Sequence, residues 1–249
     1  MHMGFKQHAK RALAAAGLSS LLLALPGCQA ITGSPTLTLV RVIDASTGSP
    51  GLDIYENGTA LTYNMGFATQ TTYIAFNPGT YKIAIDSAGT TQLLSTASAT
   101  FAANKQYTVL ISNVVASMAE TVIIDQSSPA PSGQIALRFI HESTANGGFD
   151  VYVVPTGSTI AQTSPILTNI TFGTIGNYIN VPTGTYQVVL LPTGTTVTTT
   201  TVATYTGAAT AFLSGSAHTF VILDEQVLNT PGAQVLIADD FESPSAASQ

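Results

Sequence analysis

The chain has few cysteines, few charged residues and no tryptophan for a protein of this size. Its 249 residues include one cysteine and no tryptophan, and only 8% of them are charged. A lone cysteine excludes an internal disulfide, so any fold must hold by core packing. Thr, Ser, Gly and Ala are abundant instead, a composition typical of extracellular β domains.

Basic residues are the scarcest charged class. Beyond Cys28 only Arg41, Lys82, Lys105 and Arg138 remain against 13 acidic residues, a net charge of −9. Binding to nucleic acid requires a positive surface that displaces phosphate counterions. We therefore exclude nucleic acid as a partner.

The N-terminus has the parts of a secretory signal. Three basic residues precede 14 mostly apolar residues (12–25), which are too few to span a bilayer as a helix, and Gly27-Cys28 follows. The segment resembles the lipobox of bacterial lipoproteins, which implies cleavage before Cys28 and acylation of its thiol. Two or more acyl chains anchor a protein stably. We expect a protein held to the membrane through Cys28, in the cell envelope, at the outer membrane or cell surface.

Beyond the signal, low-complexity stretches divide the chain. A Pro/Ser/Gly segment at 126–134 has no large apolar side chain and is typical of a linker. We predict six segments: signal peptide 1–27, lipidated Cys28 and spacer 28–36, first copy 37–125, linker 126–134, second copy 135–238 and a disordered acidic tail 239–249. The linker composition predicts that the copies fold separately.

The two halves repeat each other. Arg41 and Asp53 recur as Arg138 and Asp150 at a constant offset of 97 residues. The later Gly79-Thr80-Tyr81 recurs as Gly184-Thr185-Tyr186 at an offset of 105, which places about eight extra residues in the second copy, near 155–165.

Each copy has the pattern of strands. Residues 81–86 alternate large apolar with small or polar side chains, which indicates a half-buried strand, and Asn57-Gly58 favours a hairpin turn. The sequence predicts an all-β protein, with two tandem immunoglobulin-like β-sandwich domains after a lipoprotein signal peptide.

Three segments carry a resemblance to a known family. Val40-Arg41-Val42-Ile43-Asp44-Ala45-Ser46, Leu52-Asp53-Ile54-Tyr55 and Pro78-Gly79-Thr80-Tyr81 resemble the bacterial domain-of-unknown-function family 4397. The resemblance extends over nearly the whole chain after the signal. It implies secreted or surface-anchored sandwich domains, often in tandem, with no assigned activity.

Arg41 and Arg138 are the most informative polar positions. Each lies mid-strand between apolar neighbours, and a buried guanidinium is costly unless it is paired. The first interpretation is a structural ion pair within each copy, Arg41 with Asp53 and Arg138 with Asp150. The alternative is an arginine that faces a ligand groove.

No known catalytic, phosphate-binding or metal-binding motif is present. We expect no cofactor and no metal, and a non-enzymatic surface module that binds an unidentified protein or polysaccharide. Without tryptophan, a sugar platform would have to use tyrosine. The alternative is an envelope hydrolase in the second copy, which would require His141, His218 and an acid to meet in one cleft.

Overall fold

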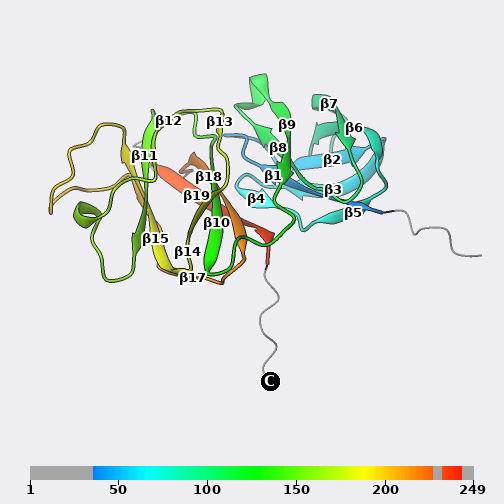
Figure 1. Ribbon diagram of the computed structural model, residues 1–249. Coiled ribbons are helices and arrows are strands. Elements are labelled where there is room, and N and C mark those ends of the chain that lie inside the picture. Colours follow the sequence, from blue (N-terminus) through cyan, green and yellow to red (C-terminus); the bar gives the residue numbers. More distant parts are fainter. Residues whose placement is uncertain (1–35, 227–231, 243–249) are drawn as a thin grey trace, which may run out of the picture. The chain divides into compact units, whose positions relative to one another are not determined.

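The computed structural model describes residues 36–226 and 232–242, and the chain from Pro35 onwards forms one compact unit. The predicted signal peptide, Cys28 and its spacer up to residue 35 lie outside the described residues. Within those residues, no helix is long and apolar enough to cross a membrane. Strands make up nearly all of the regular structure (Figure 1).

The first sandwich has two sheets whose strands are mostly antiparallel. Its inner sheet has the order β4-β1-β8-β9 with β5 also on β1, and its outer sheet has the order β3-β2-β6-β7. Only β1 and β8 pair in parallel. The strands are β1 (Thr38–Asp44), β2 (Leu52–Glu56), β3 (Thr59–Met65), β4 (Thr69–Gln70), β5 (Ile74–Phe76), β6 (Gly79–Ser87), β7 (Leu93–Phe101), β8 (Gln106–Ser112) and β9 (Ala119–Asp125).

The second sandwich repeats this topology. Its inner sheet runs β13-β10-β18-β19 with β14 on β10, and its outer sheet runs β12-β11-β15-β16 with β17 on β15. The strands are β10 (Gln134–His141), β11 (Phe149–Pro155), β12 (Leu167–Ile170), β13 (Thr174–Ile175), β14 (Ile179–Pro182), β15 (Gly184–Pro192), β16 (Tyr205–Thr206), β17 (Thr210–Phe212), β18 (Ala217–Asp224) and β19 (Ala233–Phe241). The prediction of two tandem β-sandwiches is confirmed.

Alternation along each strand builds the cores. On β6, Ile83 and Ile85 are buried between the sheets while Lys82 on the same strand is exposed. The predicted Asn57-Gly58 turn joins β2 to β3, and both residues have positive φ, 46° and 85°, as a tight hairpin requires.

Long loops distinguish the second sandwich. The two-residue turn after β2 becomes residues 156–166 after β11, which contain the short 3-10 helix η2 (Ile160–Gln162). A second long loop, 193–204, joins β15 to β16. The first loop lies where the repeat offset predicts an insertion, whereas the second has no signal in the repeat.

The central strands of the two inner sheets, β1, β8, β10 and β18, are buried on both faces. Beyond the two separate cores, one further cluster joins them, with Ile43, Leu110 and Ile123 from the first sandwich and Ile140, Val221, Leu223 and Ala238 from the second. A shared apolar interface therefore joins the two sandwiches beyond the linker, while separate folding of the copies stays a prediction. We call this interface the seam.

The predicted tail is corrected at its start. Strand β19 continues to Phe241, and Asp240 within it is only 2% exposed. Two consecutive aspartates followed by Glu242 have the composition of a solvated tail, but Asp240 is buried because it has a charged partner at the seam.

Candidate functional site

Arg41 crosses the seam. Val40 and Val42 on either side of it point into the first core, so period-2 alternation directs Arg41 toward the second sandwich. Its Nε donates to Thr108 Oγ1 at 2.8 Å and its Nη1 to the Asp239 carbonyl at 3.0 Å. Its Nη2 donates to an Asp240 carboxylate oxygen.

Arg138 makes the equivalent set of contacts in the opposite direction across the seam. Its Nε donates to Thr219 Oγ1 at 2.9 Å, its Nη1 to the Ile124 carbonyl at 3.1 Å and its Nη2 to Asp125 Oδ1 at 2.5 Å. Each arginine thus hydrogen-bonds to an aspartate at or next to the end of the last strand of the other sandwich, and each also lies 3.7–3.9 Å from the second aspartate. The seam is reciprocal, as in a two-fold symmetric dimer.

Two tyrosines complete this cluster. Tyr73 and Tyr178 lie under the guanidinium carbons of Arg41 and Arg138, with ring centroids 4.9 and 4.6 Å away. Their hydroxyls donate to Asp125 at 2.7 Å and to Asp240 at 2.8 Å. Burial, followed by the nearby carboxylate, raises the pKa of each tyrosine, so both remain protonated donors.

The predicted pairs within each copy are wrong. Asp53 lies on the outer sheet and accepts the Asn64 and Gly89 amides at 2.8 and 2.9 Å. Asp150 likewise accepts the Asn169 and Gly194 amides at 2.9 and 3.1 Å. Asp53 and Asp150 therefore hydrogen-bond to loop amides. They lie on the outer sheets, whereas Arg41 and Arg138 extend from the inner sheets toward the seam.

The two histidines of the hydrolase hypothesis do not meet. His141 stacks on Phe149 and its Nε2 lies 3.1 Å from the Gly147 carbonyl, and burial lowers its pKa. His218 is instead held between Asp239 and Ser216. Among the described residues no cluster of three or more His, Cys, Asp or Glu side chains could bind a metal.

Ser216, His218 and Asp239 form a chain that sequence reasoning missed. Asp239 Oδ1 lies 2.7 Å from His218 Nδ1, and Ser216 Oγ lies 2.8 Å from His218 Nε2, the spacing of a serine-hydrolase triad. However, Ser216 is 3% exposed and its hydroxyl donates to the Leu213 carbonyl at 2.8 Å. The serine proton is therefore directed away from the histidine.

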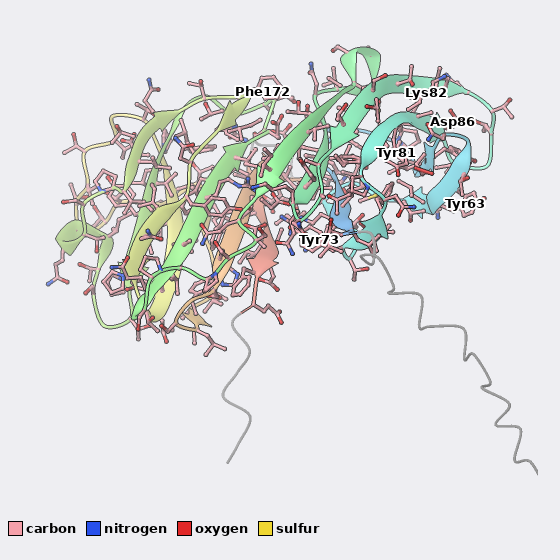
Figure 2. The ribbon with its side chains drawn as sticks, turned by 45° about the vertical axis from the view of Figure 1, so that its right-hand side comes forward. Tyr63, Tyr73, Tyr81, Lys82, Asp86 and Phe172 are labelled. Carbon is pink, nitrogen blue, oxygen red and sulfur yellow. The ribbon has the colours of Figure 1, made fainter. Side chains whose placement is uncertain are left out.

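The outer sheet of the first sandwich presents an open face. Tyr55 and Tyr63 meet edge to face with ring centroids 6.2 Å apart, and Tyr63 is 66% exposed. Lys82 and Asp86 of β6 belong to the same side of the sheet, because Ile83 and Ile85 between them point into the core. Figure 2 shows Tyr63, Lys82 and Asp86 on the strands of the first sandwich. We call this surface the tyrosine face.

Exposed hydroxyl side chains extend the tyrosine face toward β7. Thr96 and Ser98 pair with Ala84 and Lys82 across the β6–β7 ladder, and both are exposed. Nearby, Thr80 and Thr100 hydrogen-bond to each other at 2.9 Å. Desolvation, followed by the nearby Asp53, Tyr63 and Asp86, raises the pKa of Tyr55.

The equivalent face of the second sandwich is covered. Tyr152 pairs with Val189 in the register in which Tyr55 pairs with Ala84, but Tyr152 is only 4% exposed. Tyr152, Val154, Val189 and Leu191 form a closed cluster with Ile160 of η2 and with Val197 and Ala203 of the 193–204 loop. The long loops thus bury what the first sandwich exposes.

The family model described as "Domain of unknown function (DUF4397)" matches residues 38–152 of the chain. The match covers the first sandwich and ends in β11, so most of the second sandwich lies outside it, whereas the sequence resemblance was expected over nearly the whole chain after the signal. No curated protein matches the chain.

Solved structures resemble the chain only distantly. A streptococcal virulence factor described as binding α-glucan is 10% identical and covers 62% of this chain and 80% of its own, with a TM-score of 0.24. A carbohydrate-binding module of family CBM26 from Eubacterium rectale, solved with maltoheptaose, is 10% identical over 84% and 98%, with a TM-score of 0.26. A protein assigned to cell adhesion in Bacteroides fragilis is 8% identical over 86% and 92%, with a TM-score of 0.24. At this level we draw nothing about function from them.

Proposed function

We propose that this protein is a lipid-anchored, non-enzymatic module of the bacterial cell envelope that binds a neutral polysaccharide on the tyrosine face. The observation that carries the proposal is the contrast between the sandwiches: the same surface is closed by loops in the second and open in the first. An open sheet face with two adjoining aromatic rings is a binding surface that the fold has not used for its own packing.

The chemistry of the tyrosine face favours a sugar polymer. Aromatic rings offer flat apolar area with a polar hydroxyl, which suits the C–H faces and hydroxyl rims of pyranose rings. The hydroxyl side chains of β6 and β7 add hydrogen-bond partners without charge. The single Lys82 is offset by Asp86, so the face has no strong field that would select a charged polymer.

The seam supports this role by holding the binding sandwich rigidly. Four charged side chains that are 4% exposed or less join the two sandwiches reciprocally. A covered second sandwich then serves as a spacer, and acylated Cys28 as the attachment to the membrane.

Polysaccharide binding is tested by affinity electrophoresis of the full chain in gels containing an α-1,4-glucan, a β-1,3-glucan or a mannan. We expect one polymer to retard the wild type, and Tyr63→Ala to weaken binding about 2–10-fold, the value of one aromatic contact. The matched control is Phe172→Ala, since Phe172 is a 42% exposed aromatic residue on the second sandwich. Full retardation of a Tyr55→Ala/Tyr63→Ala variant, or no retardation by any polymer, would reject the proposal.

The anchor is tested separately. Cys28→Ala should release the protein from the membrane fraction or leave it as an uncleaved precursor, since no other cysteine can accept the lipid. A cleaved Cys28→Ala protein that stays in the membrane fraction would contradict lipid anchoring.

A hydrolase remains the second candidate, because Ser216, His218 and Asp239 have triad spacing. A fluorophosphonate probe distinguishes the two functions. The binding-module account expects no labelling of the native protein at Ser216, since the hydroxyl is buried and bonded to a carbonyl. Labelling that disappears in both Ser216→Ala and His218→Gln would favour the hydrolase.

A further inference from the structure

A cleft opens at the seam on the Arg41 side. Its volume is about 520 Å³, and its lining includes Arg41, Gln70, Tyr73, Gln106, Asp239 and Glu242. Gln106 contributes a buried side-chain oxygen, Oε1, that has no hydrogen-bond partner among residues 36–226 and 232–242. A buried acceptor of this kind usually has a partner. We call this the Arg41 cleft.

The opposite side of the seam is not open in the same way, because the linker occupies it. The Gln126 amide donates to Tyr178 Oη at 3.1 Å, and the Ala130 amide donates to the Gly215 carbonyl at 2.9 Å. Ala130 is 5% exposed and packs on Ala136 and Ala217. The linker thus packs against the second sandwich beside Arg138.

The strand registers make Gln106 the counterpart of Ala217. Arg41 pairs with Thr108 and Arg138 with Thr219, and two residues earlier Leu39 pairs with Gln106 and Ala136 with Ala217. The place that Ala130 covers on the second sandwich therefore corresponds to the wall of the Arg41 cleft that carries Gln106.

The sequence after β19 repeats the linker. Residues 125–134 read DQSSPAPSGQ, and residues 240–249 read DFESPSAASQ, at a constant offset of 115. The first Asp, the Ser-Pro pair and the final Gln are identical. This offset matches Asp125 to Asp240, the two reciprocal partners of the arginines, and matches Ala130 to Ser245.

We propose that the Arg41 cleft is the docking site of the chain's own C-terminal segment, Ser243–Gln249. The segment starts at the cleft, because Glu242 already lines it. In this arrangement Ser245 would occupy over Gln106 the place that Ala130 occupies over Ala217, and its hydroxyl would donate to Gln106 Oε1. The Ala130–Ala217 pair is apolar on both sides, whereas the Ser245–Gln106 pair would match a hydroxyl donor with an amide acceptor.

The test is a disulfide trap in the full chain with Cys28→Ser. Gln106→Cys/Ser245→Cys should oxidise to an intramolecular disulfide in most molecules, because only close Cα atoms can be bridged. Ala217→Cys/Ala130→Cys is the positive control, and Thr96→Cys/Ser245→Cys, with Thr96 on the outer sheet, is the negative control. A bridge in the positive control without one between positions 106 and 245, or an equal yield in the negative control, overturns the proposal.

A second measurement needs no cysteine. Ending the chain after Glu242 should speed amide exchange in a peptide covering residues 70–73 several-fold and leave one covering residues 178–182 unchanged. Unchanged exchange at 70–73 overturns the proposal. If the full-length chain is unprotected at 70–73 until a polysaccharide is added, the cleft belongs to a ligand instead, which also overturns it.

Discussion

The outer sheets of the two sandwiches have the same strand register but differ in how much of their outward face is exposed. Tyr55, Ala84 and Asp86 of the first sandwich correspond to Tyr152, Val189 and Leu191 of the second. The tyrosine is common to both sets, but Ala84 and Asp86 are replaced by the larger apolar Val189 and Leu191. The second set is covered by loops, while the first is partly exposed. The comparison indicates that one copy has become support and the other has kept a surface for a partner.

The largest expected effect lies at the seam. There the two sandwiches should lose equal unfolding free energy when equivalent aspartates are removed. Asp125→Ala and Asp240→Ala each remove the hydrogen-bonded carboxylate of one buried arginine and leave only the other aspartate, 3.9 Å from Arg138 or 3.7 Å from Arg41. Each loss should cost up to about 3–5 kcal/mol. Because the contacts are reciprocal, the two losses should agree within about 1 kcal/mol. Urea denaturation of the full chain measures both, and clearly unequal losses would contradict a reciprocal seam.

The arginine positions show how far the sequence reaches. Burial and pairing of Arg41 and Arg138 follow from a cation between apolar neighbours in both copies. Their partners do not follow, because Asp240 lies 199 residues from Arg41 and becomes close only through the packing of two sheets. The same limit applies to Tyr152: it repeats Tyr55 in sequence, and only the folded loops decide that it is covered.

A smaller effect separates the two outer sheets. Leu191 is fully buried, so Leu191→Ala should cost about 2–5 kcal/mol through lost burial and a cavity. The equivalent Asp86→Ala on the open face should change stability by no more than about 0.5 kcal/mol. Thermal unfolding of the two variants compares them directly, and a comparable loss for Asp86→Ala would mean that the tyrosine face is part of the packing.

Two buried carboxyl groups, one in each sandwich, predict a pH dependence. Burial raises the pKa of Asp44 from 3.8 to about 6 and that of Glu142 from 4.5 to about 7. Between the ordinary and the raised values the folded state binds more protons than the unfolded state, so stability falls as pH rises from about 4 to 7. We expect a loss of up to about 3 kcal/mol for each group over this range, measured by urea denaturation.

Matched amides identify the groups responsible for that dependence. Asp44→Asn in the first sandwich and Glu142→Gln in the second should each flatten the curve, the first nearer pH 6 and the second nearer pH 7. A pH profile that keeps its slope in the double variant would assign the dependence to other groups.

The central claim, that the first sandwich alone presents a binding surface, is tested most directly by hydrogen exchange of the full chain with and without the polysaccharide that retards it. The account predicts slower exchange in β2, β3 and β6, around Tyr55, Tyr63 and Lys82, and no change in β11 and β15. Protection in β11 and β15, or equal protection of both sandwiches, would contradict it.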